Sequence, residues 1–271
     1  NYNLNVGLDF GFWDRLNFTL EYYIRTTKDL LMDRPISMTT GFSSYLMNIG
    51  EVKNQGVELE IRSVNFDRED FSWTTNFNLG HNRNKIVRLD GQQTQIPSGS
   101  QIRKVGMPYR TFYVIEFAGI NPDNGMPQFY TNDPDGKGGY VKEITENPNE
   151  ANYIPMKCAD PKVSGGLSNM LRYKWFDFNI MFSYSFGGWS YDNWAQKTEH
   201  GGDDLEANIP TYYRDRWRQP GDQVKYERFI EGNDVAMSDW RNSRRLHPTD
   251  FIRLKNFTVG VTVPKEWTRK A

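Results

Sequence analysis

The first 25 residues alternate between apolar and polar side chains at every second position. The apolar positions are Leu4, Val6, Leu8, Phe10 and Phe12, followed by Leu16, Phe18, Leu20, Tyr22 and Ile24. Only the short stretch Trp13-Asp14-Arg15 separates the two sets. A period of two on both sides of a tight turn predicts a β-hairpin.

Two further pairs of strands follow the same plan. Residues 57–62 and 73–80 flank a turn near residues 67–70, and residues 163–171 and 176–186 form the next pair. A seventh strand is predicted at residues 251–263, where the apolar positions move from even numbers at Leu254 to odd numbers at Phe257. An extra residue in a strand produces this change of phase, so we expect a β-bulge near Lys255-Asn256.

The predicted connections alternate between short and long. Turns within a pair take a few residues, whereas the links between pairs cover residues 26–55, 86–162 and 187–250. Connections in compact soluble domains have a median of about four to six residues. Membrane β-barrels instead combine short turns on one side with long loops on the other. The pattern therefore predicts an all-β, antiparallel transmembrane β-barrel segment of about seven strands with long extracellular loops.

Aromatic residues make up 15% of the chain, and large ones gather at each predicted short turn. They are Phe12 and Trp13; Phe66, Phe71 and Trp73; Tyr173, Trp175 and Phe176; and Trp267. The strand arrangement puts them at one level, as in the aromatic girdle of a membrane barrel. The polar positions are rich in Asn, Ser and Gly, which suits a water-filled lumen. An antiparallel sandwich with one solvated face is the alternative.

Charge and composition exclude several classes of protein. The formal net charge is -1, and no basic stripe follows the chain, so no nucleic-acid partner is expected. No run of about 18 apolar residues occurs, which excludes a membrane-spanning helix and leaves membrane strands open. The single cysteine, Cys158, cannot form an internal disulfide, and no His/Cys cluster surrounds it. The chain begins at Asn1 without a leader, and we treat it as a fragment.

Several stretches, in order along nearly the whole chain, resemble a known family. They are YYIRTTKDLLMDRP (22–35), NQGVELEI (54–61), FSWTTNFNLGHNRNKIVRL (71–89), DPKVSGGLSNMLRYKWFDFNIMFSYSFGG (160–188), RWRQPGD (216–222) and DFIRLKNFTVGVTVPKEW (250–267). Together they resemble the SusC/RagA family of TonB-linked outer-membrane transporters.

The resemblance implies a barrel of about 22 strands in the outer membrane of a Gram-negative bacterium. It further implies an N-terminal plug in the lumen, energy from TonB, and a SusD-like surface lipoprotein that captures oligosaccharides or peptides. Residues 1–271 match only the C-terminal portion of the barrel, so the plug, the TonB-contacting segment and the final strands are expected to be absent from this chain. Outer-membrane lipid is a further expected partner, and no cofactor is expected.

Aromatic residues in the third long link are the candidate substrate-binding surface. They are Trp189, Tyr191, Trp194, Tyr212, Tyr213 and Trp240. Aromatic faces stack on sugar rings or peptide side chains. The alternative, which the length of the loop favours, is that these rings pack the loop against itself or against the lid. Trp217 fits the packing role best because RWRQPGD resembles a structural motif of the family.

Two motifs suggest other chemistry. Asp133 and Asp135 lie in an Asn-Asp-Pro-Asp-Gly stretch that resembles the start of a calcium loop, but the Glu at the twelfth position is missing, and a plain turn is favoured. Glu199, His200, Asp203 and Asp204 would be the acid/base group of an enzyme, although a solvated loop tip is the simpler interpretation. We therefore expect no enzymatic activity.

Two rivals to a nutrient importer stay open at this point. One is a soluble β-sandwich module that binds glycans through the same aromatic residues. The other is a surface glycosidase that uses Asp203 and Asp204. The substrate class, glycan or peptide, is left open because loop shape and the partner set specificity.

Overall fold

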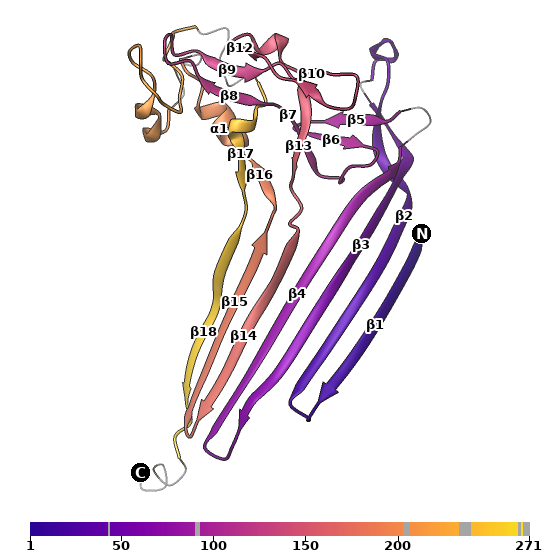
Figure 1. Ribbon diagram of the computed structural model, residues 1–271, viewed down its shortest axis with the longest axis vertical. Helices are drawn as coiled ribbons and strands as arrows, with labels where there is room; N and C mark the ends of the chain where they lie inside the picture. The colour runs from indigo at the N-terminus through magenta and orange to yellow at the C-terminus, as the bar shows by residue number, and fades with distance from the viewer. Residues whose placement is uncertain are drawn as a thin grey trace.

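The computed structural model describes residues 1–42, 44–89, 93–202, 206, 208–232, 240–264 and 267. Its main feature is one open, antiparallel sheet of seven long strands, which we call the wall (Figure 1). Each strand pairs with the next one in the wall. In sheet order the strands are β1 (Tyr2–Phe12), β2 (Leu16–Pro35), β3 (Ser44–Asp67), β4 (Phe71–Arg88), β14 (Val163–Tyr173), β15 (Phe176–Phe186) and β18 (Phe251–Val261).

Strand register gives the wall two chemically different faces. One row of directly paired residues crosses all seven strands and is entirely apolar: Phe10, Phe18, Ile61, Phe77, Leu167, Phe182 and Leu254. The adjacent row contains no large apolar side chain: Asp9, Thr19, Glu60, Asn78, Gly166, Ser183 and Arg253. Successive side chains of a strand point to opposite faces, so the alternation seen in the sequence becomes a continuous apolar face and a continuous polar face.

The predicted bulge in the seventh strand is confirmed. Met181 pairs with Asn256 and Phe182 pairs with Leu254, which leaves Lys255 as the extra residue. The bulge returns the apolar positions of β18 to the face that they share with β15.

The predicted long link over residues 26–55 is wrong for most of its length. β2 and β3 continue through it as paired strands and leave only a short connection with a 3-10 helix, η1 (Met38–Thr40). The hydrophobic alternation fades beyond Ile24, but backbone pairing continues, and one face of this part of the hairpin packs through Leu30, Met47 and Val52 against the core of Ile86 and Leu89. The links over residues 86–162 and 187–250 do fold mainly as loops, with small strands of their own.

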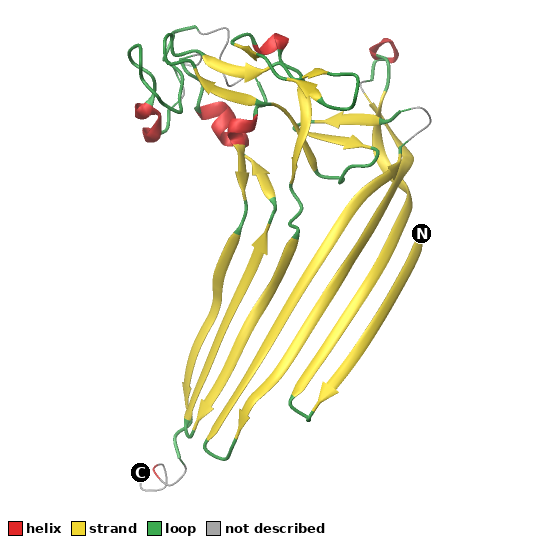
Figure 2. Cartoon of the chain, viewed as in Figure 1, coloured by secondary structure: helices red, strands yellow, loops and turns green. Residues whose placement is uncertain are grey.

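These loops form a head above the wall, which we define as the described parts of residues 36–43, 89–162 and 187–250. Figure 2 shows small sheets and short helices in the head. The strands are β5 (Gln95–Ser98), β6 (Gln101–Lys104), β7 (Thr111–Ile115), β8 (Phe117–Ile120), β9 (Pro127–Tyr130), β10 (Asp133–Pro134), β11 (Tyr140–Val141), β12 (Ile144–Thr145), β13 (Tyr153–Cys158), β16 (Trp189–Tyr191) and β17 (Leu246–Pro248). The helices are η2 (Pro148–Glu150), α1 (Asn193–Thr198), η3 (Thr211–Asp215) and η4 (Ser243–Arg245).

Apolar cores lie in the head and at its junction with the wall. One joins Val52 and Ile86 of the wall to Leu89 and Ile96. Two others are centred on Phe112 and Val114, and on Ile115 and Phe129. On the wall, by contrast, Phe10 is 49% exposed and Val259 is 50% exposed. Across the described residues no second sheet covers the apolar face, so the sandwich alternative is wrong for this chain.

The short turns and their aromatic residues lie at the end of the wall opposite the head (Figure 1). Phe66 stacks on Trp73 at one turn, and Trp175 contacts Trp267 beside the last strand. The rings at this end therefore form neighbouring groups, as expected for a girdle. Within the described ranges, no helix has the length and apolar character needed to cross a membrane.

Candidate functional site

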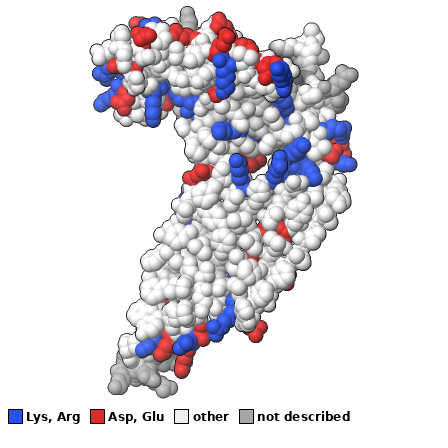
Figure 3. Space-filling view, in the orientation of Figure 1, with Lys and Arg blue, Asp and Glu red and all other residues white. Residues whose placement is uncertain are grey.

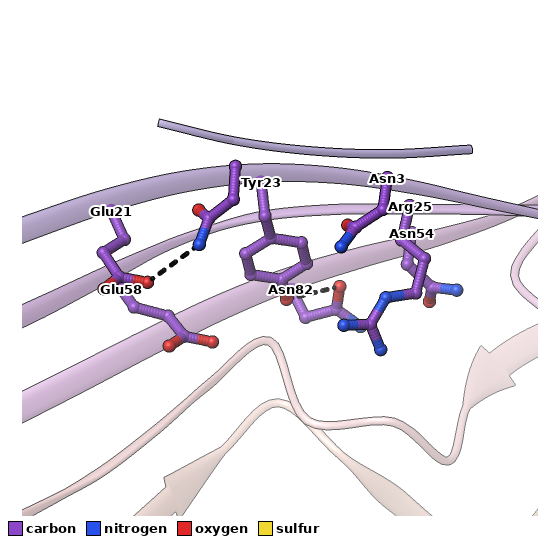
Figure 4. Close-up of a pocket in the computed structure, with 8 residues that line it drawn as sticks. Asn3, Glu21, Tyr23, Arg25, Asn54, Glu58 and Asn82 are labelled. Atoms are coloured by element: carbon purple, nitrogen blue, oxygen red, sulfur yellow. Dashed lines mark hydrogen bonds between the residues drawn. The ribbon is translucent and has the colours of Figure 1, made fainter. Parts of the chain in front are cut away.

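The polar face of β1 to β4 contains a groove of about 460 Å³ near the head end of the strands (Figure 4). The side chains that line it come from four neighbouring strands and point to the same side of the sheet. They are Asn3, Asn5, Glu21, Tyr23, Arg25, Asn54, Glu58 and Asn82. Strand alternation positions them, because each is an odd residue of β1 or β2 or an even residue of β3 or β4.

Tyr23 is the central side chain of this groove. Its hydroxyl donates a hydrogen bond to Oδ1 of Asn82, over 3.0 Å. The ring lies across Gly56, where an added Cβ would come within 2.6 Å of the Tyr23 hydroxyl oxygen and 2.3 Å of the His81 carbonyl oxygen. Glycine at position 56 therefore lets the tyrosine lie flat against the strands.

Charged groups and amides share the rest of the groove. Glu21 lies directly opposite Glu58 across β2 and β3, and Arg25 lies four residues beyond Glu21 on the same face. Asn84 donates to Asn54 over 2.8 Å just above them. Carboxylates accept hydrogen bonds, amides both accept and donate, and the guanidinium donates. The groove can therefore bind a ligand with many hydroxyl or amide groups.

In the head, the structure separates the predicted aromatic residues into packed and exposed ones. Tyr191 is buried against Phe112, and Trp189 packs on the same core while Lys157 lies 4.7 Å from its ring centroid. Tyr213 is 1% exposed, and Trp240 packs on the core of Ile115 and Phe129. Packing of the loop against itself, the alternative favoured from the sequence, describes Tyr213, which contacts Tyr226, whereas Tyr191 packs both on Leu246 of its own loop and on Phe112 of the link over residues 86–162.

Trp194 and Tyr212 are the exposed members of the set, with 76% and 45% of their surfaces accessible in this chain. Trp194 lies on α1, whose first turn is capped by the Asp192 carboxylate. Tyr212 donates its hydroxyl hydrogen to Glu199 over 3.0 Å. Partial burial and the Glu199 carboxylate raise the pKa of Tyr212 to about 12. The tyrosine is therefore a hydrogen-bond donor at neutral pH.

Trp217 has the packing role expected of it. Its indole Nε1 donates to the Pro122 carbonyl oxygen over 2.8 Å, and its ring lies against Gly125. An added Cβ at Gly125 would lie 2.5 Å from the indole, so glycine is needed at this contact. The tryptophan thereby joins two loops that are far apart in the sequence.

Glu199 and His200 are buried, so the expectation of a solvated loop tip is wrong for them. Arg244 binds Glu199 over 2.9 Å and Glu227 over 2.7 Å, and all three side chains are largely inaccessible. Although burial opposes its charge, the two carboxylates hold the pKa of Arg244 above its ordinary value. The carboxylates neutralise the arginine and join η4 to two other parts of the same loop, the end of α1 and the segment around Glu227. Asp203 and Asp204 lie outside the described residues.

The Asp133–Asp135 stretch forms a turn. Asp133 and Pro134 pair with β11, and the Asp135 carboxylate accepts hydrogen bonds from the backbone of Lys137 and Gly139. Within the described part of the chain, no group of three or more His, Cys, Asp or Glu residues has a metal-binding arrangement. Cys158 is half-buried, and burial raises the pKa of its thiol.

Comparison with known proteins identifies the family. The family model described as "TonB dependent receptor-like, beta-barrel" matches residues 1–221. The chain belongs to this family. TonB-dependent receptor P3 of Formosa agariphila is 30% identical over 98% of this chain, which covers 27% of that protein. TonB-dependent receptor SusC of Bacteroides thetaiotaomicron is 27% identical over 97% of the chain, which covers 26% of that protein.

A solved structure agrees with this assignment. The RagAB peptide transporter structure aligns with a TM-score of 0.84 and 26% identity, over 97% of this chain and 29% of that chain. The SusC and RagAB matches confirm the SusC/RagA resemblance. Such receptors are outer-membrane proteins of Gram-negative bacteria and are not enzymes. The chain spans about a quarter of the length of the curated relatives it matches.

The alternation in the sequence predicted the polar face of the wall, but it did not predict the groove around Tyr23 on that face. Alternation indicates which side a residue faces, whereas the groove depends on the register among four strands. The close approach of Tyr23 to Gly56 is also a property of register. The Arg244 network was missed for another reason: its carboxylates, Glu199 and Glu227, are 45 and 17 residues away along an irregular loop.

Proposed function

We propose that the chain forms part of the wall and the extracellular head of a TonB-dependent importer for oligosaccharides or oligopeptides. The in-register separation of the two faces of the wall carries this proposal. A continuous apolar face suits the hydrocarbon of a membrane, and a continuous polar face suits an aqueous passage. The head then stands on the extracellular side, because the short turns of such barrels face the periplasm.

The wall is proposed to be a C-terminal portion of a larger barrel. Among the described residues, no strand pairs with the outer edge of β1 or of β18. Unpaired backbone groups in hydrocarbon cost several kcal/mol each, so both edges need neighbouring strands in the membrane. The resemblance to SusC/RagA supports a plug and a TonB-contacting segment elsewhere in the parent protein.

The proposed substrate route runs from the head to the groove of Figure 4. Trp194 and Tyr212 are exposed on the head and offer faces for stacking on sugar rings or peptide side chains. The groove offers amide and carboxylate groups in the passage below. A SusD-like lipoprotein is proposed to cover the head and deliver the substrate. Both glycans and peptides remain candidates, because their chemistry suits these same groups.

Uptake by cells that express the parent protein tests the proposal. The probes are fluorescently labelled oligosaccharide and oligopeptide mixtures, each with and without a functional TonB system. We expect uptake of one mixture, dependent on TonB, and a severalfold loss of uptake in a Glu58→Arg variant, which places a cation in the groove. Glu69→Arg at a turn on the opposite end is the matched control. Uptake of neither mixture, or uptake that persists without TonB, would contradict the proposal.

A further inference from the structure

The apolar face of β3 and β4 ends in a set of positively charged residues. Above Leu79, the next residues of β4 on this face are His81, Arg83 and Lys85. Across the strand pair, Gln55 faces Arg83 and Lys53 faces Lys85. Below them, the paired positions Leu59 and Leu79, and Ile61 and Phe77, are apolar. We call Lys53, Arg83 and Lys85 the basic rim.

The basic rim lies on the face of β3 and β4 opposite the core that joins the wall to the head. Val52 and Ile86, the neighbours of Lys53 and Lys85 on the other face, are buried with Leu89 and Ile96. Arg83 and Lys85 are exposed, and Lys53 is partly exposed. Figure 3 shows the same change along the molecule: the strands carry few charged side chains over most of their length, and basic side chains gather where they meet the head.

The rim has no negative partner of its own. Lys53 and Lys85 are directly opposite each other, an arrangement of like charges that destabilises a sheet. In the part of the chain that the structure describes, no carboxylate lies within ion-pair distance of any of the three. The nearby Glu51 forms an ion pair with Arg88, whose Nε lies 3.8 Å from Oε2 of Glu51. An external anion would relieve this repulsion.

The rim also lies at the level where lipid headgroups are expected. Trp73 belongs to the aromatic group at the short turns, and Arg83 and Lys85 follow it by ten and twelve residues on the same strand. At about 3.3 Å per residue and a tilt of about 40°, this separation is about 25–30 Å along the membrane normal. The apolar band of an outer-membrane barrel is about 25 Å tall.

A groove beside the rim completes the surface. Its volume is about 470 Å³, and it is lined by Lys53, Gln55, Arg83, Lys85, Val87, Val105 and Gly106. The lysines supply mobile point charges, and the arginine supplies a planar fork that matches phosphate oxygens. The two valines give the same groove an apolar part. A lipid with a phosphate on its headgroup presents both kinds of surface.

We infer that the basic rim binds the phosphate-bearing headgroup of an outer-leaflet lipid, whose acyl chains lie on the apolar face below. This inference rests on the proposed membrane orientation of the wall. It adds a specific lipid site on the outer surface of the barrel, separate from the substrate route on the polar face. The bound phosphate would offset the repulsion between Lys53 and Lys85 and thereby stabilise the junction between the wall and the head.

Native mass spectrometry of the full parent protein in detergent tests the inference. The probes are lipid A that carries phosphate and the same lipid A after its phosphate is removed. We expect preferential binding of the phosphorylated form. The variant Lys53→Gln/Arg83→Gln/Lys85→Gln should lose affinity by about 100-fold, because each cation at an anionic surface contributes about fivefold. The control Lys137→Gln/Arg214→Gln/Lys225→Gln removes three cations from the head and should bind like the parent protein.

Further measurements separate the possible failures. Equal binding of the two lipid A forms, or equal loss in both triple variants, would overturn the lipid site while leaving the importer proposal intact. Displacement of the lipid by millimolar inorganic phosphate would assign the rim to a free anion instead. Heat-modifiable gel migration of the parent protein and of both variants reports barrel folding. Its absence from the parent protein would refute the membrane proposal itself.

Discussion

Gly56 and Tyr23 show how one residue sets the shape of the polar groove. An added Cβ at Gly56 meets backbone as well as the tyrosine ring, so neither neighbour can move away easily. The sequence alone marks Gly56 only as a glycine within a strand. Its role follows from the cross-strand pairing with Tyr23 and Asn82, which a linear pattern does not contain.

We expect Gly56→Ala to destabilise the barrel by about 1–3 kcal/mol, the usual cost of overpacking. The substitution should also break the hydrogen bond between Tyr23 and Asn82. Urea unfolding of the parent protein in lipid vesicles measures the change. Gly7→Ala is the matched control, because its added Cβ meets only the Glu21 side chain at 3.7 Å. Equal losses of unfolding free energy in the two variants would show that the close contact between residue 56 and Tyr23 does not limit which residue fits there.

Lys174 is strained in the turn between β14 and β15. Its φ of 52° is left-handed, a conformation that costs a residue with a side chain about 1–2 kcal/mol relative to glycine. Lys174→Gly should therefore raise the free energy of unfolding by about 1 kcal/mol. Arg68→Gly, in the turn between β3 and β4 and without a positive φ, should give no such gain. The same urea titration compares them, and an equal gain in both would show that the left-handed φ of Lys174 is not the cause.

At the scale of elements, hydrophobic alternation predicted the wall strands well. It also located the bulge at Lys255, because the phase of the pattern changes there. It failed in the outer parts of β2 and β3, where backbone pairing continues without a regular apolar alternation. The small strands of the head were not predicted, since pieces of two to six residues carry too short a pattern to recognise.

The two faces of β15 give a direct test of the wall. Phe182 lies on the apolar face and Ser183 on the polar face, near the middle of the strand. We expect Phe182→Arg to destabilise the folded barrel in vesicles by about 2–4 kcal/mol, the cost of a cation at the bilayer midplane. Ser183→Arg should cost much less, because its guanidinium would lie on the polar face, away from lipid. The opposite order would mean that the polar face contacts lipid.

Tyr212, which lies in η3, makes the stability of the head depend on pH. Its pKa is raised to about 12 by partial burial and by Glu199, whereas the unfolded chain has the ordinary value of about 10. The folded head favours the protonated form of Tyr212. The contribution of this proton to folding stability is therefore complete below about pH 10 and is lost as the pH rises towards 12. Thermal unfolding of the head between these values should show this loss, and Tyr212→Phe should reduce it. Glu199→Gln should lower the midpoint of tyrosinate absorbance, and no shift would contradict the assigned cause.

At the scale of the whole molecule, the wall and the head are stabilised in different ways. The wall relies on backbone pairing and on the lipid proposed to cover its apolar face, whereas the head buries apolar cores and an ion network of its own. Sequence patterns describe the first kind of structure because it is periodic. They miss the second kind because its contacts join residues such as Trp217 and Pro122, which are 95 positions apart.

This difference predicts that the head can be loosened without unfolding the wall. Arg244→Met leaves Glu199 and Glu227 buried without their cation, a change that costs about 3–5 kcal/mol. Because both carboxylates and Arg244 lie in the loop over residues 187–250, we expect faster proteolysis of that loop, while heat-modifiable migration of the barrel is unchanged. Arg214→Met removes an exposed cation nearby and should leave proteolysis at the parent rate. If Arg244→Met also abolished heat-modifiable migration, the head and the wall would have to be treated as one cooperative unit.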